Sequence, residues 1–518
     1  MLFKENAKDM DYESIYKDFK FDIPDHLNIS EEIEKNSGVA LIDKNKKMTY
    51  REIKERSGYV AKLLREIGIS KGDVVSILLD QSFDFVISLL GIYKMGGTAL
   101  ALSPVFGDEA IKYRICSSGS RAIISNIQFR EKFKSIDIIK IGDGLDFGIN
   151  GKNSNEPYEN TKKSDPAQLI YTSGTTGNPK GAMLPHQWVI GNMPAWIMGY
   201  DFPDAGSLFS TPAEWAWAGG LADSLLPALY TGNTVVIRER KKFDPDEFFD
   251  FLNLFHINYL FLVPSAIRMI KSSGKIYNHN VKSILTGGEY ISPELINYMH
   301  DRLGIRVNQT YGQTEANMVL INMYKWNNLD KTGRPVPGHS VNIYHSDGTL
   351  CNEGETGEIG VELPDPVVMI GYNNADAKII KNVIMTGDLG YSDHGFIKYV
   401  NRSDEIIKIS GYRINPIEVE NVIDEIPFVK KSAVAGIDDD IRGKIIGAII
   451  VLKDKTVQNP DKIIKEYVRD RLALYAYPRL IKFSDFLPET YTGKIARALV
   501  KRELIEYKSS INEINYGK

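Results

Sequence analysis

The chain alternates between segments whose apolar residues recur every three or four positions and segments that are continuously apolar. Residues 49–68 show the first pattern, which predicts an amphipathic helix. Residues 72–79 show the second and predict a buried strand, which is followed by a predicted helix over residues 82–96 and a strand over residues 98–105. Strands that alternate with helices of this length predict βαβ units in a parallel sheet.

The same rhythm returns further along the chain. Residues 233–239 predict a strand, a helix begins near Asp244, and residues 258–263 and 281–288 predict two more strands. Residues 343–363 differ, because short β-rich runs there are separated by turn residues, which is typical of a small antiparallel unit.

Two domains are predicted from these changes in pattern. Residues 1–402 form a large N-terminal α/β domain of parallel-sheet βαβ units with a small β-rich unit, and residues 403–518 form a small α+β domain. Residues 1–45 are mostly charged and polar, so we expect them to form a surface arm or helix.

Composition excludes several classes of protein. Of the 518 residues, 43% are apolar and 25% charged, as in ordinary globular domains, and 63 basic against 67 acidic residues leave no strong attraction to nucleic acid. Two cysteines, Cys116 and Cys351, argue against a disulfide framework, and the eight histidines show no metal-ligand spacing with cysteine or aspartate. The charged N-terminus lacks the apolar core of a signal peptide, and no apolar run has the length of a membrane span, so we expect a cytoplasmic protein.

A short loop carries groups suited to binding phosphate. Residues 171–181 read YTSGTTGNPKG and follow an apolar strand-like run. Its glycines, hydroxyl side chains and single lysine would offer backbone N–H groups, hydroxyl donors and a cation to a polyphosphate. The loop is not a Walker A motif, because Pro179 stands five places after Gly174 and no Lys-Ser or Lys-Thr pair follows. A flexible surface turn is the alternative interpretation of the loop by itself.

The loop resembles the signature of the adenylate-forming superfamily, which includes acyl-CoA synthetases, peptide-synthetase adenylation domains and firefly luciferase. Further motifs of that superfamily follow in its order along the chain. They are GGEY at residues 287–290, YGQTE at 311–315, TGDLG at 386–390, RSDE at 402–405, KISGYR at 408–413 and TGK at 492–494.

The resemblance implies that a carboxylate and ATP form an acyl-adenylate, from which the acyl group passes to a second nucleophile. Because two anions meet in the first step, the site has to neutralise charge at the α-phosphate. By resemblance Thr314 contacts that phosphate, Glu315 is the Mg²⁺ ligand, and Lys494 bridges carboxylate and phosphate oxygens. The residues implied for the β- and γ-phosphates are Thr172, Ser173, Gly174, Thr175, Thr176 and Lys180.

The resemblance also assigns the rest of the nucleotide site. Asp388 matches the acid that accepts hydrogen bonds from both ribose hydroxyls, Arg402 the arginine that reaches the ribose, and Arg413 one that contacts phosphate. The residues implied for adenine are Gly288, Glu289 and Tyr290, which flank the ring, and Tyr311, which stacks on it.

In this superfamily the small C-terminal domain is mobile and rotates between the two half-reactions. Asp404 matches the hinge residue, which would absorb the change in backbone conformation. CoA is the implied second substrate, because YGQTE and KISGYR resemble acetyl- and medium-chain acyl-CoA synthetases. The residues expected to contact CoA are Ser410, Gly411, Tyr412 and Arg469; for Arg469, an ordinary solvated helix position is the alternative.

The acid itself is predicted from one position of the YGQTE motif. Acetate-specific relatives carry a tryptophan where this chain has Gly312, and removing an indole opens room for several carbons. Each buried CH₂ contributes about 0.8 kcal/mol, so a medium-chain or branched acid should be preferred to acetate. Trp217 and Ala218 align with positions that line the acyl pocket, and core packing is the alternative for Trp217.

Three functions remain open at this point. The first is an AMP-forming acyl-CoA synthetase that uses ATP, Mg²⁺, CoA and a small carboxylate, without nucleic acid or a membrane span. The second is an adenylating ligase that loads a separate carrier protein. The third is a non-catalytic nucleotide-binding scaffold, which would not need Lys180, Glu315, Asp388 and Lys494. The sequence leaves the oligomeric state open.

Overall fold

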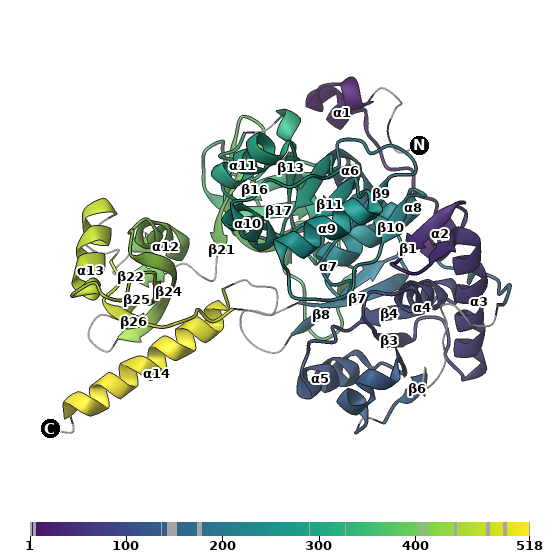
Figure 1. The fold of residues 1–518 in the computed structure, drawn as a ribbon, viewed down its shortest axis with the longest axis horizontal. Coiled ribbons are helices and arrows are strands. Elements are labelled where there is room, and N and C mark those ends of the chain that lie inside the picture. Colours follow the sequence, from purple (N-terminus) through teal and green to yellow (C-terminus); the bar gives the residue numbers. More distant parts are fainter. Residues whose placement is uncertain are drawn as a thin grey trace. The chain divides into compact units, whose positions relative to one another are not determined.

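The computed structural model describes two compact units of the chain, and Figure 1 labels many of their helices and strands. The described residues are 3, 7–135, 137–141, 153–172, 179–289, 291–326, 328–402, 407–409, 412–439, 443–472, 477–489 and 495–516. The large unit contains the described residues up to 386 together with residues 391–398. The small unit contains residues 387–390 and the described residues from 399 onward.

The first sheet of the large unit has seven strands among the described residues, and its centre is parallel. Parallel central strands are buried on both faces, which explains why strands β3, β4 and β5 are almost continuously apolar. The strands, in order across the sheet, are β18 (Gly371–Tyr372), β8 (Lys180–Pro185), β7 (Pro166–Thr172), β4 (Thr98–Ala101), β3 (Val74–Leu78), β5 (Ala122–Ser125) and β6 (Ile139–Ile141).

The second sheet of the large unit has nine strands in the described part of the chain. Its centre is again parallel, and a β13–β14 hairpin closes one side in antiparallel pairing. The order is β15 (Arg334–Pro335), β14 (Ala316–Asn322), β13 (Arg306–Gln313), β12 (Ser283–Thr286), β11 (Tyr259–Phe261), β9 (Leu208–Ser210), β10 (Thr234–Val236), β1 (Val39–Ile42) and β2 (Lys47–Thr49).

Helices of the large unit bury the apolar stripes that the sequence predicted. The side chain of Thr49 and that of Glu52 form a capping box, which fixes the start of the helix predicted over residues 49–68. The helices are α1 (Tyr12–Asp18), α2 (Ile29–Glu34), α3 (Tyr50–Glu66), α4 (Phe83–Lys94), α5 (Asp108–Ser118), α6 (Trp188–Gly199), α7 (Ala218–Gly220), α8 (Leu226–Tyr230), α9 (Pro245–Phe255), α10 (Pro264–Ser273) and α11 (Pro293–Leu303), with short turns η1 (Ala7–Asp9), η2 (Ile127–Phe133), the π-helical η3 (Leu221–Leu225) and η4 (Tyr324–Trp326).

The N-terminal segment departs from the expected surface arm. Ile29 and Ile33 of α2 are fully buried, and so is the side chain of Glu34. Glu34 forms an ion pair with the buried Lys94 of α4, at 2.8 Å between Oε2 and Nζ. The polar composition of residues 1–45 misled the prediction, because a buried charge with a partner is indistinguishable in sequence from a solvated one.

The remaining sheets separate as predicted into a small β-rich unit and an α+β region. A sheet of five strands among the described residues consists of β16 (Val341–Tyr344), β17 (Gly357–Glu362), β19 (Ile379–Ile380), β20 (Val383–Asp393) and β21 (Phe396–Arg402). The small unit adds β22 (Ile407–Ile409), β23 (Tyr412–Ile414), β24 (Val429–Asp439), β25 (Gly443–Leu452), β26 (Leu480–Phe483), α12 (Pro416–Asp424), α13 (Pro460–Arg471) and α14 (Arg497–Tyr516).

Both faces of the β24–β25–β26 sheet are covered. Val434 packs with α12 and α13, whereas its neighbours Ala433 and Ala435 pack with Val500 and Leu504 of α14. This alternation follows from the two-residue period of a strand. The predicted α/β fold class with a small α+β part is therefore confirmed.

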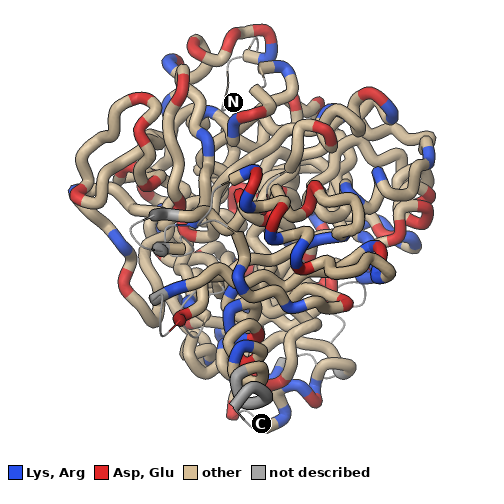
Figure 2. Tube along the Cα trace, turned by 90° about the vertical axis from the view of Figure 1, so that its left-hand side faces the viewer, with Lys and Arg blue, Asp and Glu red and all other residues tan. Residues whose placement is uncertain are grey.

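Charged residues of both signs are interspersed along the described chain, as Figure 2 shows. This distribution agrees with the near balance of 63 basic and 67 acidic residues. Among the described residues, no helix combines the length and the apolarity needed to cross a membrane.

Candidate functional site

The two strands that flank the predicted phosphate loop form an antiparallel hairpin. Strands β7 and β8 pair so that Thr172 lies opposite Lys180. The Lys180 ammonium group lies 5.4 Å from the centre of the Tyr372 ring. The loop between them holds Ser173, Gly174, Thr175 and Thr176, which lie outside the described residues. The hairpin thus places the two ends of the predicted phosphate loop side by side.

Glu315, the predicted metal ligand, meets this hairpin. It lies in the turn between β13 and β14, next to Thr314, and its Oε1 accepts hydrogen bonds from the Tyr372 hydroxyl at 2.5 Å and from the Thr172 hydroxyl at 3.5 Å. Residues 143 positions apart in the sequence are therefore in contact. A carboxylate surrounded by hydroxyl groups is a hard-oxygen environment, which fits Mg²⁺. Tyr372 could not be predicted from the sequence, because it carries no motif.

The segment predicted to flank adenine follows β12. Gly288 adopts a positive φ of 83°, which favours glycine, and Tyr290 lies outside the described residues. The carboxylate of Glu289 is bound by a residue of α10, since Arg268 Nη2 donates a hydrogen bond to its Oε2 at 2.8 Å. Tyr311, in β13, is half-buried.

In the small unit, two residues predicted to reach the ribose form an ion pair. Arg402 Nη1 donates to Asp388 Oδ1 at 3.0 Å, and the Asp388 side chain is 8% exposed. Gly387 has a φ of 77°, and a Cβ there would lie 3.0 Å from Arg402 Nη2, so the glycine lets the guanidinium approach. The structure brings these two predicted residues together.

The other predicted residues of the small unit are less fully defined. Tyr412 and Arg413 belong to β23, and their side chains lie outside the description, as do Asp404, Ser410, Gly411 and Lys494 altogether. Arg469 is an exposed residue of α13, and its Nε lies 3.4 Å from Oδ1 of its neighbour Asp470. The predicted boundary between residues 402 and 403 stays a prediction.

Two of the predicted acyl-pocket residues lie at the start of a helical segment of the large unit. Trp217 caps α7, and its ring packs 5.9 Å from that of Phe261. Ala218, the first residue of α7, is 6% exposed. Trp217 is thus partly buried against an aromatic neighbour, and its contact with a substrate stays a prediction.

Close packing of the backbone explains why residue 312 is a glycine. It lies at an irregularity in the β13–β14 pairing, and a Cβ on it would be 2.3 Å from the backbone nitrogen of Met318. No side chain fits there unless the hairpin moves. The prediction that this glycine opens the acyl pocket therefore stays a prediction, because close backbone approach already accounts for the residue.

We expect Gly312→Ala to lower the free energy of unfolding by about 1–3 kcal/mol, as overpacking does, and to reduce turnover of every acid in parallel. Urea denaturation and rates with short and long acids measure the two effects. Gly371→Ala, whose added Cβ would meet nothing within 4 Å, is the matched control. A variant as stable as the parent that prefers shorter acids would show instead that a side chain at position 312 projects into the acyl pocket and not into the hairpin.

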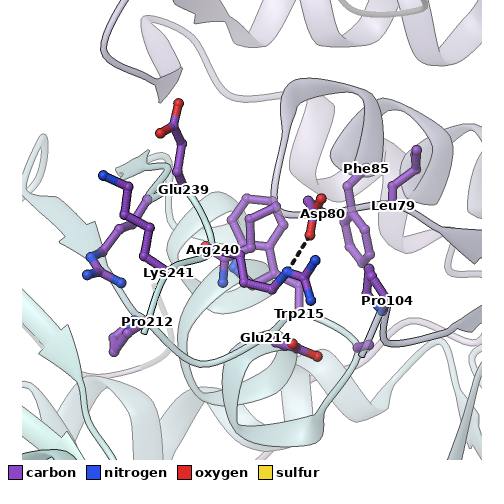
Figure 3. Close-up of a pocket in the computed structure, with 13 residues that line it drawn as sticks. Leu79, Asp80, Phe85, Pro104, Pro212, Glu214, Trp215, Glu239, Arg240 and Lys241 are labelled. Atoms are coloured by element: carbon purple, nitrogen blue, oxygen red, sulfur yellow. Dashed lines mark ion pairs between the residues drawn. The ribbon is translucent and has the colours of Figure 1, made fainter. Parts of the chain in front are cut away.

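A pocket that the sequence analysis missed lies where strands from both large sheets end (Figure 3). Asp80, Pro104, Pro212 and Arg240 each lie within four residues after the end of a parallel strand, namely β3, β4, β9 and β10. Ligands bind preferentially at such carboxyl ends. Arg240 Nε pairs with Asp80 Oδ1 at 2.8 Å, and Trp215 lines the pocket. Residues directly after predicted strands are the signal that would have found it.

Two of the histidines, His186 and His345, have surroundings that bear on a possible functional role. His186, close after the phosphate loop, is fully buried, and burial lowers the pKa of its ring to about 4, which indicates a structural role. Contrary to the expectation from spacing, ligand atoms of His345, Cys351 and Glu355 lie within 4.8 Å of one another. His345 and Glu355 form an ion pair at 3.6 Å, which accounts for their proximity without a metal.

Comparisons with known proteins identify the family. A family model described as an AMP-binding enzyme matches residues 33–373, and one described as the AMP-binding enzyme C-terminal domain matches residues 418–494. The chain therefore belongs to the AMP-binding enzyme family, and the predicted adenylate-forming superfamily is confirmed.

Relatives that match most of the chain narrow the class of enzyme. An uncharacterized acyl-CoA ligase of Bacillus subtilis is 29% identical, covering 89% of this chain and 91% of its own length. The mitochondrial acyl-coenzyme A synthetase ACSM3 of Rattus norvegicus is 28% identical, covering 95% of this chain and 93% of its own length. A crystal structure of an anthranilate CoA ligase with anthranoyl-AMP shares the fold, with a TM-score of 0.82 at 21% identity over 93% of this chain and 98% of that one. The predicted enzyme class, an AMP-forming acid–CoA ligase that uses ATP and CoA, is confirmed.

Proposed function

We propose that this enzyme activates a medium-chain or branched carboxylic acid through an acyl-adenylate and transfers it to CoA. The contact of Glu315 with Thr172 and Tyr372, beside Lys180, supports the adenylation step, whereas the choice of acid rests on the absence of an indole at Gly312. This contact brings a hydroxyl group at the start of the predicted phosphate loop, a cation and a carboxylate to one place, and these groups together suit a metal–polyphosphate complex.

Glu315 would hold Mg²⁺ through a carboxylate whose direction is set by other groups. The Tyr372 hydroxyl, at 2.5 Å from Oε1, restricts the rotation of that carboxylate, as outer partners of metal ligands commonly do. The ion, when bound, would neutralise phosphate charge. Thr172 and Lys180 would bind the β- and γ-phosphates together with Ser173, Gly174, Thr175 and Thr176, and Thr314 would donate to the α-phosphate.

The remaining nucleotide contacts are proposed for the other predicted residues. Asp388 would accept hydrogen bonds from the ribose hydroxyls, and Arg402, which already donates to one of its oxygens, would keep the carboxylate oriented. Glu289 would act through its backbone, because Arg268 occupies its carboxylate. Gly288, Tyr290 and Tyr311 would enclose adenine, and Arg413 would contact phosphate.

The second half-reaction would depend on a movement of the C-terminal domain, residues 403–518, about Asp404. Ser410, Gly411 and Tyr412 would line the path of the pantetheine arm, and Arg469 would bind a CoA phosphate. The exposure of Arg469 supports this role, since its side chain is 43% exposed and its described partner is only the adjacent Asp470. Trp217, Ala218 and the backbone of Gly312 would line the acyl pocket. A cytoplasmic location of the protein stays a prediction.

CoA-dependent formation of AMP from ATP and Mg²⁺ tests the proposal. The panel would run from acetate to decanoate and include isobutyrate, 2-methylbutyrate and benzoate. We expect the highest kcat/KM between about four and eight carbons, because each further buried CH₂ adds roughly 0.8 kcal/mol until the pocket is full.

Each other result has a distinct meaning. Acetate as the best substrate would contradict the proposed acid and leave the ligase reaction intact. ATP–pyrophosphate exchange without transfer to CoA would indicate a carrier protein as the acceptor. Absence of both reactions with every acid would overturn the proposed function and favour a non-catalytic nucleotide-binding protein.

A further inference from the structure

A buried carboxylate lies in the helical segment that carries the predicted acyl-pocket residues. Asp223 belongs to the π-helical turn η3, which directly follows α7 and Ala218, and it is 5% exposed. π-Helical turns are rare and frequently occur at functional sites. Neither the family motifs nor the reaction proposed above uses this residue.

The hydrogen bonds around Asp223 leave most of its capacity unused. Asn317 Nδ2 donates to Asp223 Oδ1 at 2.7 Å and to Asn192 Oδ1 at 3.0 Å, so both of its N–H groups are engaged. The Tyr200 hydroxyl reaches only the backbone carbonyl of Asp223, at 3.0 Å. Among the described residues, Asn317 is the one side chain found to donate to this carboxylate, which has about four acceptor positions.

Such an arrangement is unfavourable for folding. A buried carboxylate is destabilising unless it is paired and well hydrogen-bonded, and a well-packed apolar residue in its place is often neutral or stabilising. Burial raises the pKa of Asp223 to about 7, against one opposing hydrogen bond from Asn317. Asp223 therefore keeps acceptor positions that no described side chain fills, and these are open to a donor on a bound ligand.

The position of Asp223 and Asn317 indicates which kind of ligand could supply the donor. Asn317 follows Glu315 by two residues, so their Cα atoms lie within about 7.6 Å of each other. Asp223 follows Ala218 by five residues in continuous helical structure. The cluster thus joins the helical segment of the proposed acyl pocket to the hairpin of the proposed metal ligand.

We propose that Asp223 and Asn317 recognise a hydrogen-bond donor, an ammonium or hydroxyl group, at the end of the acid remote from its carboxylate. This inference rests on the proposed function and specifies its substrate. The Cα atoms of Glu315 and Asn317 are at most about 7.6 Å apart, and this short separation favours a short acid. Acids with four or five carbons and a terminal donor are therefore the first to test.

Matched pairs of acids test the proposal, because an ammonium group and a methyl group have similar size. The pairs are 5-aminopentanoate with hexanoate and 4-aminobutanoate with pentanoate, and 5-hydroxypentanoate separates a neutral donor from a charged one. ATP–pyrophosphate exchange gives kcat/KM for each acid. For the wild-type enzyme we expect the donor-bearing member of a pair to be preferred by about 10–100-fold, the effect of one hydrogen bond to a charged group.

Variants assign the preference to this residue. Asp223→Asn keeps the shape and an acceptor, so it should lose most of the preference for ammonium and keep that for hydroxyl. Asp223→Leu should favour hexanoate. Asp204→Asn, which changes an exposed acid paired with Lys282, should keep the wild-type ratios.

The outcomes separate this proposal from the one on which it rests. A wild-type enzyme that prefers hexanoate and pentanoate, or ratios unchanged in Asp223→Asn, would overturn the role of Asp223 and leave the acyl-CoA ligase reaction standing. Absence of exchange with every acid would overturn both. If Asp223→Leu does not fold, the wild-type ratios and Asp223→Asn decide the question.

Discussion

Replacing Lys494 by alanine is expected to slow acyl-adenylate formation by about 10²–10³-fold, the usual effect of removing one donor to a developing negative charge. The physical reason is that the ammonium group would bridge the carboxylate and the α-phosphate only while charge builds between them. Transfer of a preformed acyl-adenylate to CoA should change little, because that step does not need the bridge.

The two half-reactions are measured separately. ATP–pyrophosphate exchange reports the first, and thioester formation from added acyl-AMP and CoA reports the second. Lys501→Ala is the matched control, since Lys501 is an exposed residue of α14, and both rates should stay at the wild-type level. Equal loss of both half-reactions in Lys494→Ala would show that the lysine acts on the fold of the domain rather than on adenylation.

Replacing Lys94 by methionine is expected to lower the free energy of unfolding by about 3–5 kcal/mol. Lys94 is 1% and Glu34 0% exposed, with 2.8 Å between Nζ and Oε2. Glu34 also accepts from Ser30, Ser57 and Tyr158, so it would remain fixed in place as a buried charge without its cation. Burial lowers the pKa of Lys94, against the pull of Glu34 in the opposite direction.

Urea denaturation followed by circular dichroism measures this loss as a shift of the transition midpoint. Lys35→Ala removes an exposed pair with Glu32 in the same region and should cost less than about 1 kcal/mol. The double variant Glu34→Gln, Lys94→Met should recover part of the stability, because no charge is then left unpaired. A midpoint for Lys94→Met equal to that of Lys35→Ala would contradict the structural role of the pair.

Much of the fold could be predicted because the patterns that specify it are local. The helix expected over residues 49–68 is α3, with its capping box at Thr49 and Glu52, and the apolar run at residues 72–79 contains β3. The order of strands could not be predicted. In the nine-stranded sheet β9 lies between β11 and β10, and β1 pairs with β10, since these pairings depend on which apolar faces meet.

The sequence by itself determined the family and the reaction class, because these are carried by contiguous motifs, and the same motifs predict the residues of the nucleotide site. Only the tertiary structure decided what those residues contact. It joined Glu315 to Tyr372, which has no motif; it engaged the carboxylate of Glu289 with Arg268; and it placed Asp223 beside Asn317. The burial of a charged group sets the free-energy cost of its charge, and long-range contacts supply its partners. Both burial and long-range contacts arise only when distant segments pack together.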